Sequence, residues 1–238
     1  MNIVLITPEQ AQSEIWSIQS SRQLQHLHQH LAVKVGDQLK VGIRGGARYL
    51  TEVIAVTADE IQLKALVSQA VPEKLPVTLI VAMPRPKVLR RLIMDSVTLG
   101  VEKIVLLHSY RVDKSYWQSP LLQQIDDYVT LGLEQAGDTM APCIEIHKRF
   151  KPFVEDMLPS YIAAQRPAYV AHPYATTAMP HAIEHACSIV IGPEGGFIPY
   201  EIDLLVANGC QAVSLGSRIL RTETAIPYVL GRLFSQYG

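Results

Sequence analysis

Two loops in the C-terminal fifty residues carry the residue types best suited to binding a small polar ligand. The first is the run 191–197, Ile-Gly-Pro-Glu-Gly-Gly-Phe, which directly follows the apolar segment 188–191. Its glycines permit close backbone approach and positive φ angles, and its proline stiffens the loop. A plain strand-to-helix turn is the simpler interpretation. Three glycines and a proline within residues 192–196 favour a binding loop whose backbone amides contact a nucleoside.

The second loop is the run 215–225, Leu-Gly-Ser-Arg-Ile-Leu-Arg-Thr-Glu-Thr-Ala. A helix is predicted to begin near Thr222, with Glu223 in its first turn, where an acid interacts favourably with the helix dipole. Helix capping does not explain two arginines that flank an Ile-Leu pair. The apolar pair can line an adenine pocket, and Arg218 and Arg221 can hold the loop or an anionic partner.

The elements that position these loops are predicted strands that alternate with helices. Continuous or alternating apolar runs predict strands at 77–82, 104–107, 169–171, 188–191 and 212–215. Apolar positions at helical spacing predict helices from 87 to the cap at Gly100, over 121–133 and over 224–234. This alternation predicts an α/β domain with a mostly parallel sheet covered on both faces. Ligands of such sheets bind past the carboxyl ends of the strands.

A different pattern occupies residues 30–70, where short strands are predicted. Alternating apolar residues at 39–43 lead into a Gly-Gly turn, and further strands are predicted at 53–56 and 61–65. A small β unit of this size is common among RNA-binding barrels, although small barrels serve many functions. The Pro-containing segment 71–76 predicts a hinge, so we expect domains at 1–72 and 73–238.

Composition narrows the class of protein. The chain has 238 residues, 48% of them hydrophobic and 18% charged, as expected of a compact folded protein. Its three cysteines suit burial in a reducing cytoplasm, and no apolar run reaches the length of a membrane span. No Walker loop, dinucleotide fingerprint, serine elbow or zinc-protease motif is present. Alternating His26, His28 and His30 are better explained by a polar strand or surface segment than by a metal site, so we expect no metal.

The net charge of −1 predicts no overall positive field, but basic residues cluster locally. Each cluster alone is equally well explained as a solvated surface. Together they predict one RNA-binding surface that draws on both domains. The candidate RNA-binding residues are Arg22, Arg44, Arg48, Arg85, Lys87, Arg90, Arg91 and Arg111.

The two C-terminal loops closely resemble the signature loops of the RsmE-type ribosomal RNA uridine-N3 methyltransferases, which belong to the SPOUT class. Weaker likeness covers nearly the whole chain. The resemblance implies a PUA-like β-barrel followed by a SPOUT-type parallel sheet with a C-terminal trefoil knot. It further implies that S-adenosylmethionine binds between the knotted loops. The implied cofactor residues are His172, Pro173, Ile191, Gly192, Pro193, Glu194, Gly195, Gly196, Leu215, Gly216, Ser217, Arg218, Ile219 and Leu220.

The resemblance also implies how the protein acts and assembles. Arg221 and Glu223 would face the reacting centre. Since uridine N3 carries a weakly acidic proton, Glu223 is our candidate base and Arg221 our candidate stabiliser of the developing anion. The expected substrate is small-subunit ribosomal RNA. The expected assembly is a homodimer across the C-terminal helix, with the flank at Tyr228 left for the partner.

Departures from the family pattern fall on the RNA side. Ala32 stands where the family has arginine, Asp95 and Thr98 where it has lysine and glutamate, Tyr110 where it has glutamate, and Asp138 where it has arginine. An alternative function is therefore an RNA-binding protein that retains the cofactor pocket without catalysis. A third is a nucleotide-handling enzyme that uses 192–196 as an anion nest. The absence of a lysine after these glycines argues against the third.

Overall fold

The computed structural model describes residues 1–163 and 165–235. The chain folds into two compact units. The first comprises Met1–Glu73 together with Val129–Ala141, and the second comprises Lys74–Tyr128 and the chain from Pro142 onward. From the sequence we expected two continuous domains, with Val129–Ala141 in the second. In the structure this segment instead belongs to the first unit.

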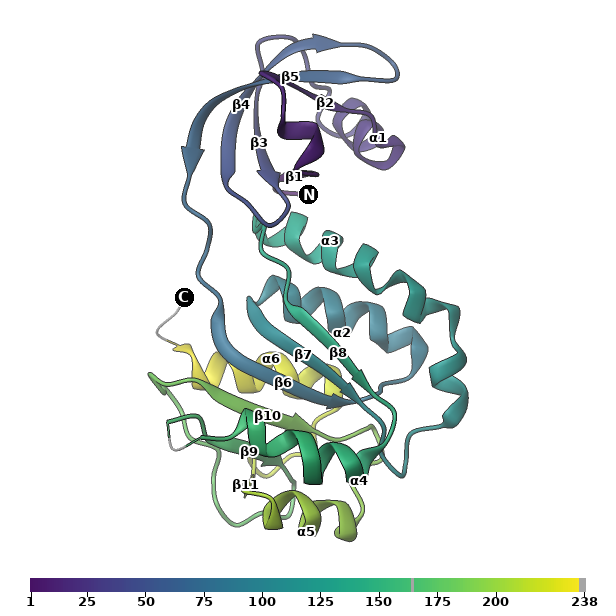
Figure 1. The fold of residues 1–238 in the computed structure, drawn as a ribbon, viewed down its shortest axis with the longest axis vertical. Coiled ribbons are helices and arrows are strands. Elements are labelled where there is room, and N and C mark those ends of the chain that lie inside the picture. Colours follow the sequence, from purple (N-terminus) through teal and green to yellow (C-terminus); the bar gives the residue numbers. More distant parts are fainter. Residues whose placement is uncertain (164, 236–238) are drawn as a thin grey trace. The chain divides into compact units, whose positions relative to one another are not determined.

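The first unit is built on a five-stranded sheet with the strand order β1-β3-β4-β5-β2 (Figure 1). The strands are β1 (Val4–Ile6), β2 (Ile15–Ile18), β3 (Gln38–Ile43), β4 (Arg48–Val56) and β5 (Ile61–Gln69). Strands β1 and β3 pair in parallel, and the other pairs are antiparallel. The three strands predicted from the sequence are β3, β4 and β5. Gly45, with φ of 74°, makes the turn between β3 and β4.

The histidine segment is a helix and not a polar strand. Helix α1 (Ser21–Gln29) contains His26 and His28, and His30 follows its last residue. Leu24 and Leu27, three positions apart, pack into the core with Trp16. Helical spacing of the leucines therefore decides the conformation, and the alternation of the histidines is incidental.

Polar contacts join the segment Val129–Ala141 to the rest of the first unit. Glu134, only 1% exposed, forms an ion pair with Arg22 at 2.7 Å and accepts a hydrogen bond from the Gln23 amide at 2.9 Å. Arg44 donates to the Thr130 hydroxyl at 3.2 Å. Arg48 donates to the Gly137 carbonyl at 2.7 Å. These arginines therefore stabilise the protein's own fold.

The second unit contains a six-stranded sheet with the order β11-β9-β10-β6-β7-β8, in which every pair is parallel. The strands are β6 (Leu75–Ala82), β7 (Val101–Leu107), β8 (Cys143–His147), β9 (Ala168–Ala171), β10 (Cys187–Ile191) and β11 (Cys210–Val213). All of them except β8 were predicted from apolar runs. The fold is therefore α/β with a parallel sheet, as expected.

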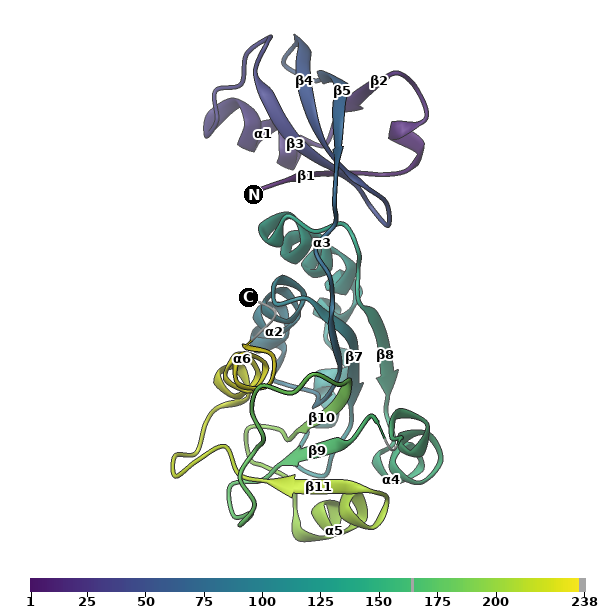
Figure 2. The same cartoon turned by 90° about the vertical axis from the view of Figure 1, so that its left-hand side faces the viewer.

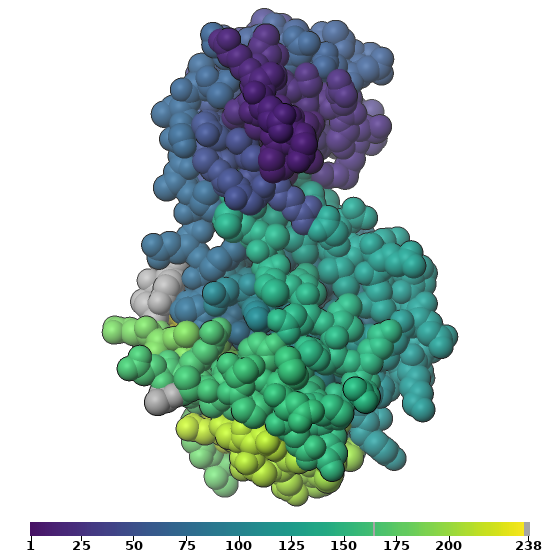
Figure 3. Space-filling view, viewed as in Figure 1, coloured from purple at the N-terminus to yellow at the C-terminus, as the bar shows by residue number. Residues whose placement is uncertain are grey.

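Helices cover the sheet on two sides (Figure 2). The described α-helices outside the first unit are α2 (Pro86–Thr98), α4 (Phe150–Pro152), α5 (Pro199–Ala207) and α6 (Thr222–Leu233), and α3 (Ile125–Ala136) begins in the second unit and ends in the first. Four short helical turns are η2 (Lys114–Gln118), η3 (Pro120–Gln124), η4 (Phe153–Met157) and η5 (Leu158–Tyr161), and η1 (Glu9–Ala11) lies in the first unit. Helices α2 and α6 contact each other. The segment from β8 through η5 forms much of the visible surface of the second unit (Figure 3).

Two of the three cysteines are buried as expected. Burial raises the pKa of the Cys187 and Cys210 thiols to about 12. Cys143 is instead exposed, because it begins the edge strand β8. Among the described residues, no helix combines the length and apolar character needed to cross a membrane.

Candidate functional site

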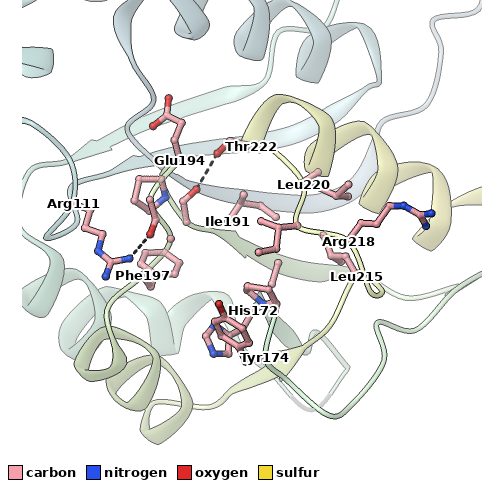
Figure 4. Close-up of a pocket in the computed structure, with 18 of the residues that line it drawn as sticks. Arg111, His172, Tyr174, Ile191, Glu194, Phe197, Leu215, Arg218, Leu220 and Thr222 are labelled. Carbon is pink, nitrogen blue, oxygen red and sulfur yellow. Dashed lines mark hydrogen bonds between the residues drawn. The ribbon is translucent and has the colours of Figure 1, made fainter.

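A pocket of about 340 Å³ lies at the carboxyl ends of β9, β10 and β11 (Figure 4). These strands are neighbours in a parallel sheet, so the loops that follow them leave the same edge. The residues that line the pocket are Arg111, Ala171, His172, Pro173, Tyr174, Ile191, Gly192, Pro193, Glu194, Gly195, Gly196, Phe197, Leu215, Gly216, Arg218, Ile219, Leu220, Thr222 and Ala225. The structure thus brings the two loops singled out in the sequence into one pocket.

The glycine-rich loop closes tightly on itself. A Cβ atom at Gly192 would lie 3.2 Å from the Phe197 ring, and Gly196 has φ of 71°. The Thr222 hydroxyl donates a hydrogen bond to the Gly192 carbonyl at 3.2 Å. The first residue of α6 therefore fixes the loop that follows β10, and larger residues at these glycines would have to displace neighbours.

Arg111 reaches this pocket from the loop after β7. Its guanidinium donates a hydrogen bond to the Gly195 carbonyl (Figure 4). Sequence reasoning placed Arg111 among RNA-binding residues and not in the cofactor pocket. The pairing of β7 with β6, and of β6 with β10, brings its loop to the same sheet edge. That strand order could not be read from the sequence.

Apolar side chains stand at the mouth of the pocket. Ile219 is 76% exposed and Tyr174 is 79% exposed, although both line the pocket. Tyr174 also packs edge-on against His172, with ring centroids 5.6 Å apart.

Of the predicted cofactor residues, Ser217 is not among the lining residues. Gly216, with φ of 122°, lies in the bend that precedes Arg218.

The predicted catalytic pair lies outside this pocket. Arg221 is exposed and precedes α6, where its carbonyl accepts from Thr224 and Ala225. Glu223 lines a second pocket, of about 470 Å³, between α6 and α2. Its other lining residues are Lys87, Val88, Arg90, Arg91, Met94 and Asp95. Carboxylate atom Oε2 of Glu223 is buried and has no hydrogen-bond partner among the described residues.

The predicted RNA-binding arginines are divided by the structure. Arg90 and Arg91 lie with Glu223 in the second pocket. Arg85 interacts with Glu194, since its backbone N–H donates to Oε1 at 3.2 Å. Arg22, Arg44 and Arg48 contact Val129–Ala141 within the first unit, as described above. A cluster of basic residues in the sequence therefore does not show which of their side chains are available to bind a partner.

Comparisons with known proteins agree with this architecture. Residues 71–234 match the RNA methyltransferase domain family. Ribosomal RNA small subunit methyltransferase E of Treponema pallidum is 31% identical over 94% of this chain and 87% of its own length. The protein of the same name from Synechocystis is 28% identical over 97% and 76%.

Solved structures show the same fold. A ribosomal RNA small subunit methyltransferase E from Neisseria gonorrhoeae, bound to S-adenosyl methionine, has a TM-score of 0.78 at 19% identity, covering 97% of this chain and 95% of that one. A putative methyltransferase from Legionella pneumophila, in complex with the same cofactor, has a TM-score of 0.78 at 23% identity with the same coverage. The chain belongs to the ribosomal RNA small subunit methyltransferase E family of RNA methyltransferases.

Proposed function

We propose that this protein transfers a methyl group from S-adenosylmethionine to N3 of a uridine in small-subunit ribosomal RNA. The observation that carries the proposal is that the loops after β9, β10 and β11 together form one pocket. The relatives that bear the ribosomal RNA methyltransferase name, and that match over most of this chain, support the substrate class.

The residues of the pocket fit the cofactor. A volume of about 340 Å³ lies within the range of small-molecule sites. Ile191, Leu215 and Leu220 provide apolar walls for an adenine ring. The three glycines of the loop 192–196 leave backbone peptide groups uncovered for the polar edges of a ligand, and the loop is so tight that a Cβ atom at Gly192 would lie 3.2 Å from Phe197. When bound, the cofactor supplies an electrophilic methyl group on its sulfonium.

The chain's own residues supply positioning and proton transfer. The first turn of α6 holds Thr222 against the cofactor loop and places Glu223 in the neighbouring pocket. A buried carboxylate oxygen without a partner is suited to accept the uridine N3 proton, and Arg221 stabilises the negative charge that develops on the base. Much of the rate comes from holding the base in line with the methyl group.

We also propose the finer features of the fold and assembly that the family resemblance implies. The first unit is a PUA-like barrel, and the loops around the pocket form a trefoil knot. The protein is a cytoplasmic homodimer. Ile226, Val229, Leu230, Leu233 and Phe234 are buried within the chain, so the partner would meet the exposed flank of α6. Tyr228, 43% exposed, lies on that flank.

A second candidate function is an RNA-binding protein without catalysis. Asp138, where the resemblance implies an arginine, is buried and accepts hydrogen bonds from the backbone of Thr139 at 2.6 Å and Met140 at 2.9 Å. This residue therefore has a structural role and contributes no positive charge to an RNA surface.

The deciding experiment is nucleoside mass spectrometry of small-subunit ribosomal RNA from cells with and without the gene, followed by methylation of the unmodified RNA by the purified protein. Loss of one N3-methyluridine in the deletion strain, restored in vitro, is the expected result. Cofactor binding with no methyl transfer to free RNA or assembled subunits would instead establish the second candidate.

A further inference from the structure

A basic surface that extends beyond the proposed site follows strands β7 and β8. We call it the β7–β8 edge surface and define it by His108, Tyr110, Arg111, Lys114, Trp117, Lys148 and Arg149. Arg111, Lys114, Lys148 and Arg149 are exposed, and His108 and Trp117 are half-buried. The carboxyl ends of neighbouring parallel strands meet at one edge, which explains why segments 40 residues apart lie together.

Direct contacts make these residues one surface. The backbone N–H of His108 donates to the His147 carbonyl at 2.9 Å, which joins the ends of β7 and β8. The Trp117 indole donates to Nδ1 of His108 at 2.9 Å. Lys148 places its ammonium group 5.9 Å from the centre of the Trp117 ring, so the tryptophan supports a cation from the neighbouring loop.

The surface is continuous with the cofactor pocket. Arg111 belongs to both, because it donates to the Gly195 carbonyl. Phe150, next to Arg149 in the chain, packs against the pocket residue Phe197 with ring centroids 5.8 Å apart. A polymer held on this surface would therefore extend from the pocket at which the methyl group is transferred.

The basic side chains of the surface have no acidic ion-pair partner among the residues that the structure describes. Lys114, Lys148 and Arg149 form no ion pair with any residue that the structure describes, whereas nearby Lys151 lies 3.6 Å from Glu155. Asp113 uses its carboxylate to accept from the Ser115 backbone at 2.8 Å. Burial and the charge of Lys114 lower the pKa of His108, with Glu201 opposing them. Such a concentration of cations on a chain of net charge −1 indicates an anionic partner.

An exposed aromatic side chain indicates which class of anion the surface binds. Tyr110 is 76% exposed and stands next to Arg111 in the chain. Unpaired bases stack on such rings while cations contact the phosphates, a combination typical of proteins that bind single strands. A membrane surface would require no stacking residue.

We propose that the β7–β8 edge surface binds the single-stranded RNA segment that flanks the target nucleotide, with Lys114, Lys148 and Arg149 on its phosphates and Tyr110 against a base. The proposal rests on the methyltransferase function proposed above. It assigns an RNA contact to residues that sequence clustering did not select, because they are distant from one another along the chain.

The test compares two double variants of equal charge in the full-length protein. Lys148→Ala with Arg149→Ala removes two cations that have no ion-pair partner among the described residues of the surface. Lys64→Ala with Lys151→Ala removes two cations that already pair with Glu14 and Glu155. Binding to unmodified small-subunit ribosomal RNA transcribed in vitro is measured over a salt series, together with KM for that RNA and calorimetric cofactor affinity.

Each phosphate contact to a single strand contributes about 0.7 to the log–log salt slope. The surface variant should therefore lose about 1.4 from the slope and on the order of 25-fold in affinity at 0.1 M salt. KM for the RNA should rise correspondingly, and cofactor affinity should not change. Tyr110→Ala should weaken binding without altering the slope.

Three other outcomes would each reject either the docking proposal or the proposed function. If the wild type methylates the RNA but the surface variant binds it as tightly as the charge-matched control, the docking proposal is wrong and the function stands. If the surface variant is impaired on assembled subunits and normal on free RNA, the surface contacts protein and the proposal is equally wrong. If the wild type binds the cofactor yet neither binds nor methylates RNA, the function itself fails.

Discussion

The carboxylate of Glu201 accepts a hydrogen bond from the backbone N–H of Tyr110 at 2.8 Å. Its second oxygen accepts from the backbone N–H of Ile198 at 3.0 Å. Glu201 is only 2% exposed, so these bonds form away from water. One side chain on α5 therefore ties the loop that carries Arg111 to the loop that follows the glycines. We interpret Glu201 as a residue that positions Arg111 at the proposed cofactor pocket.

Glu201→Gln should weaken cofactor binding by about tenfold, because an amide can accept only one of the two backbone hydrogen bonds and leaves the other donor unpaired. Calorimetry on Glu201→Gln, Arg111→Ala and the double variant provides the measurement. If Glu201 acts through Arg111, the two effects are not additive. Additive losses would show that Glu201 contributes only general stability.

Gly195→Arg should abolish cofactor binding. A Cβ atom added at Gly195 would lie 3.1 Å from Cδ of Arg111, so a long cationic side chain would displace Arg111 and enter the pocket. Gly195→Ala provides the graded comparison and should cost less, since only the flexible Arg111 chain must move. Unchanged calorimetric affinity in Gly195→Arg would remove this loop from the cofactor site.

Glu223→Gln should reduce kcat by about 100-fold or more, the usual contribution of a general base, while cofactor affinity stays the same. Single-turnover methylation of small-subunit ribosomal RNA measures the chemical step directly. Asp95→Asn, which alters another acid of the second pocket, is the matched control. Equal rates in the wild type and Glu223→Gln would assign proton removal to another group or to water.

Stability should fall in acid partly through Glu145. The Tyr161 hydroxyl at 2.5 Å and the Lys103 ammonium at 2.9 Å lower the pKa of Glu145 from 4.5 to about 2. A depressed folded-state pKa adds stability that is complete above the unfolded-state value and is lost as the pH falls from about 4.5 toward 2.

Urea unfolding at a series of pH values checks this expectation. Glu145→Gln should be less stable than the wild type at neutral pH and should lose less stability across the acid window. Glu73→Gln changes an exposed acid and serves as the control. Parallel pH profiles for the wild type and Glu145→Gln would show that this carboxylate is not linked to folding.

The buried strands of the second unit are predictable because parallel strands covered on both faces are continuous apolar runs. Strand β8 is not predictable in that way. Its residues Cys-Ile-Glu-Ile-His are exposed or only partly buried at the sheet edge, so no apolar run marks it. Helical periodicity over 121–133 likewise indicates a buried face but cannot say which unit buries it. The candidate site was predictable to a similar extent. The two loop sequences identify most residues of the pocket, but the place of Arg111 depends on the order of the strands in the sheet, which the sequence does not reveal.

Helix α3 crosses from one unit to the other within a single run of backbone hydrogen bonds, at the step from Tyr128 to Val129. The chain therefore passes between the units three times, and neither unit is a continuous stretch of sequence. A fragment ending at residue 72 would lack Glu134 and would leave the Arg22 guanidinium and Gln23 amide without their buried carboxylate. In genetic terms the first unit cannot be inherited, exchanged or deleted as a simple N-terminal module, because part of its interior is encoded inside the methyltransferase domain.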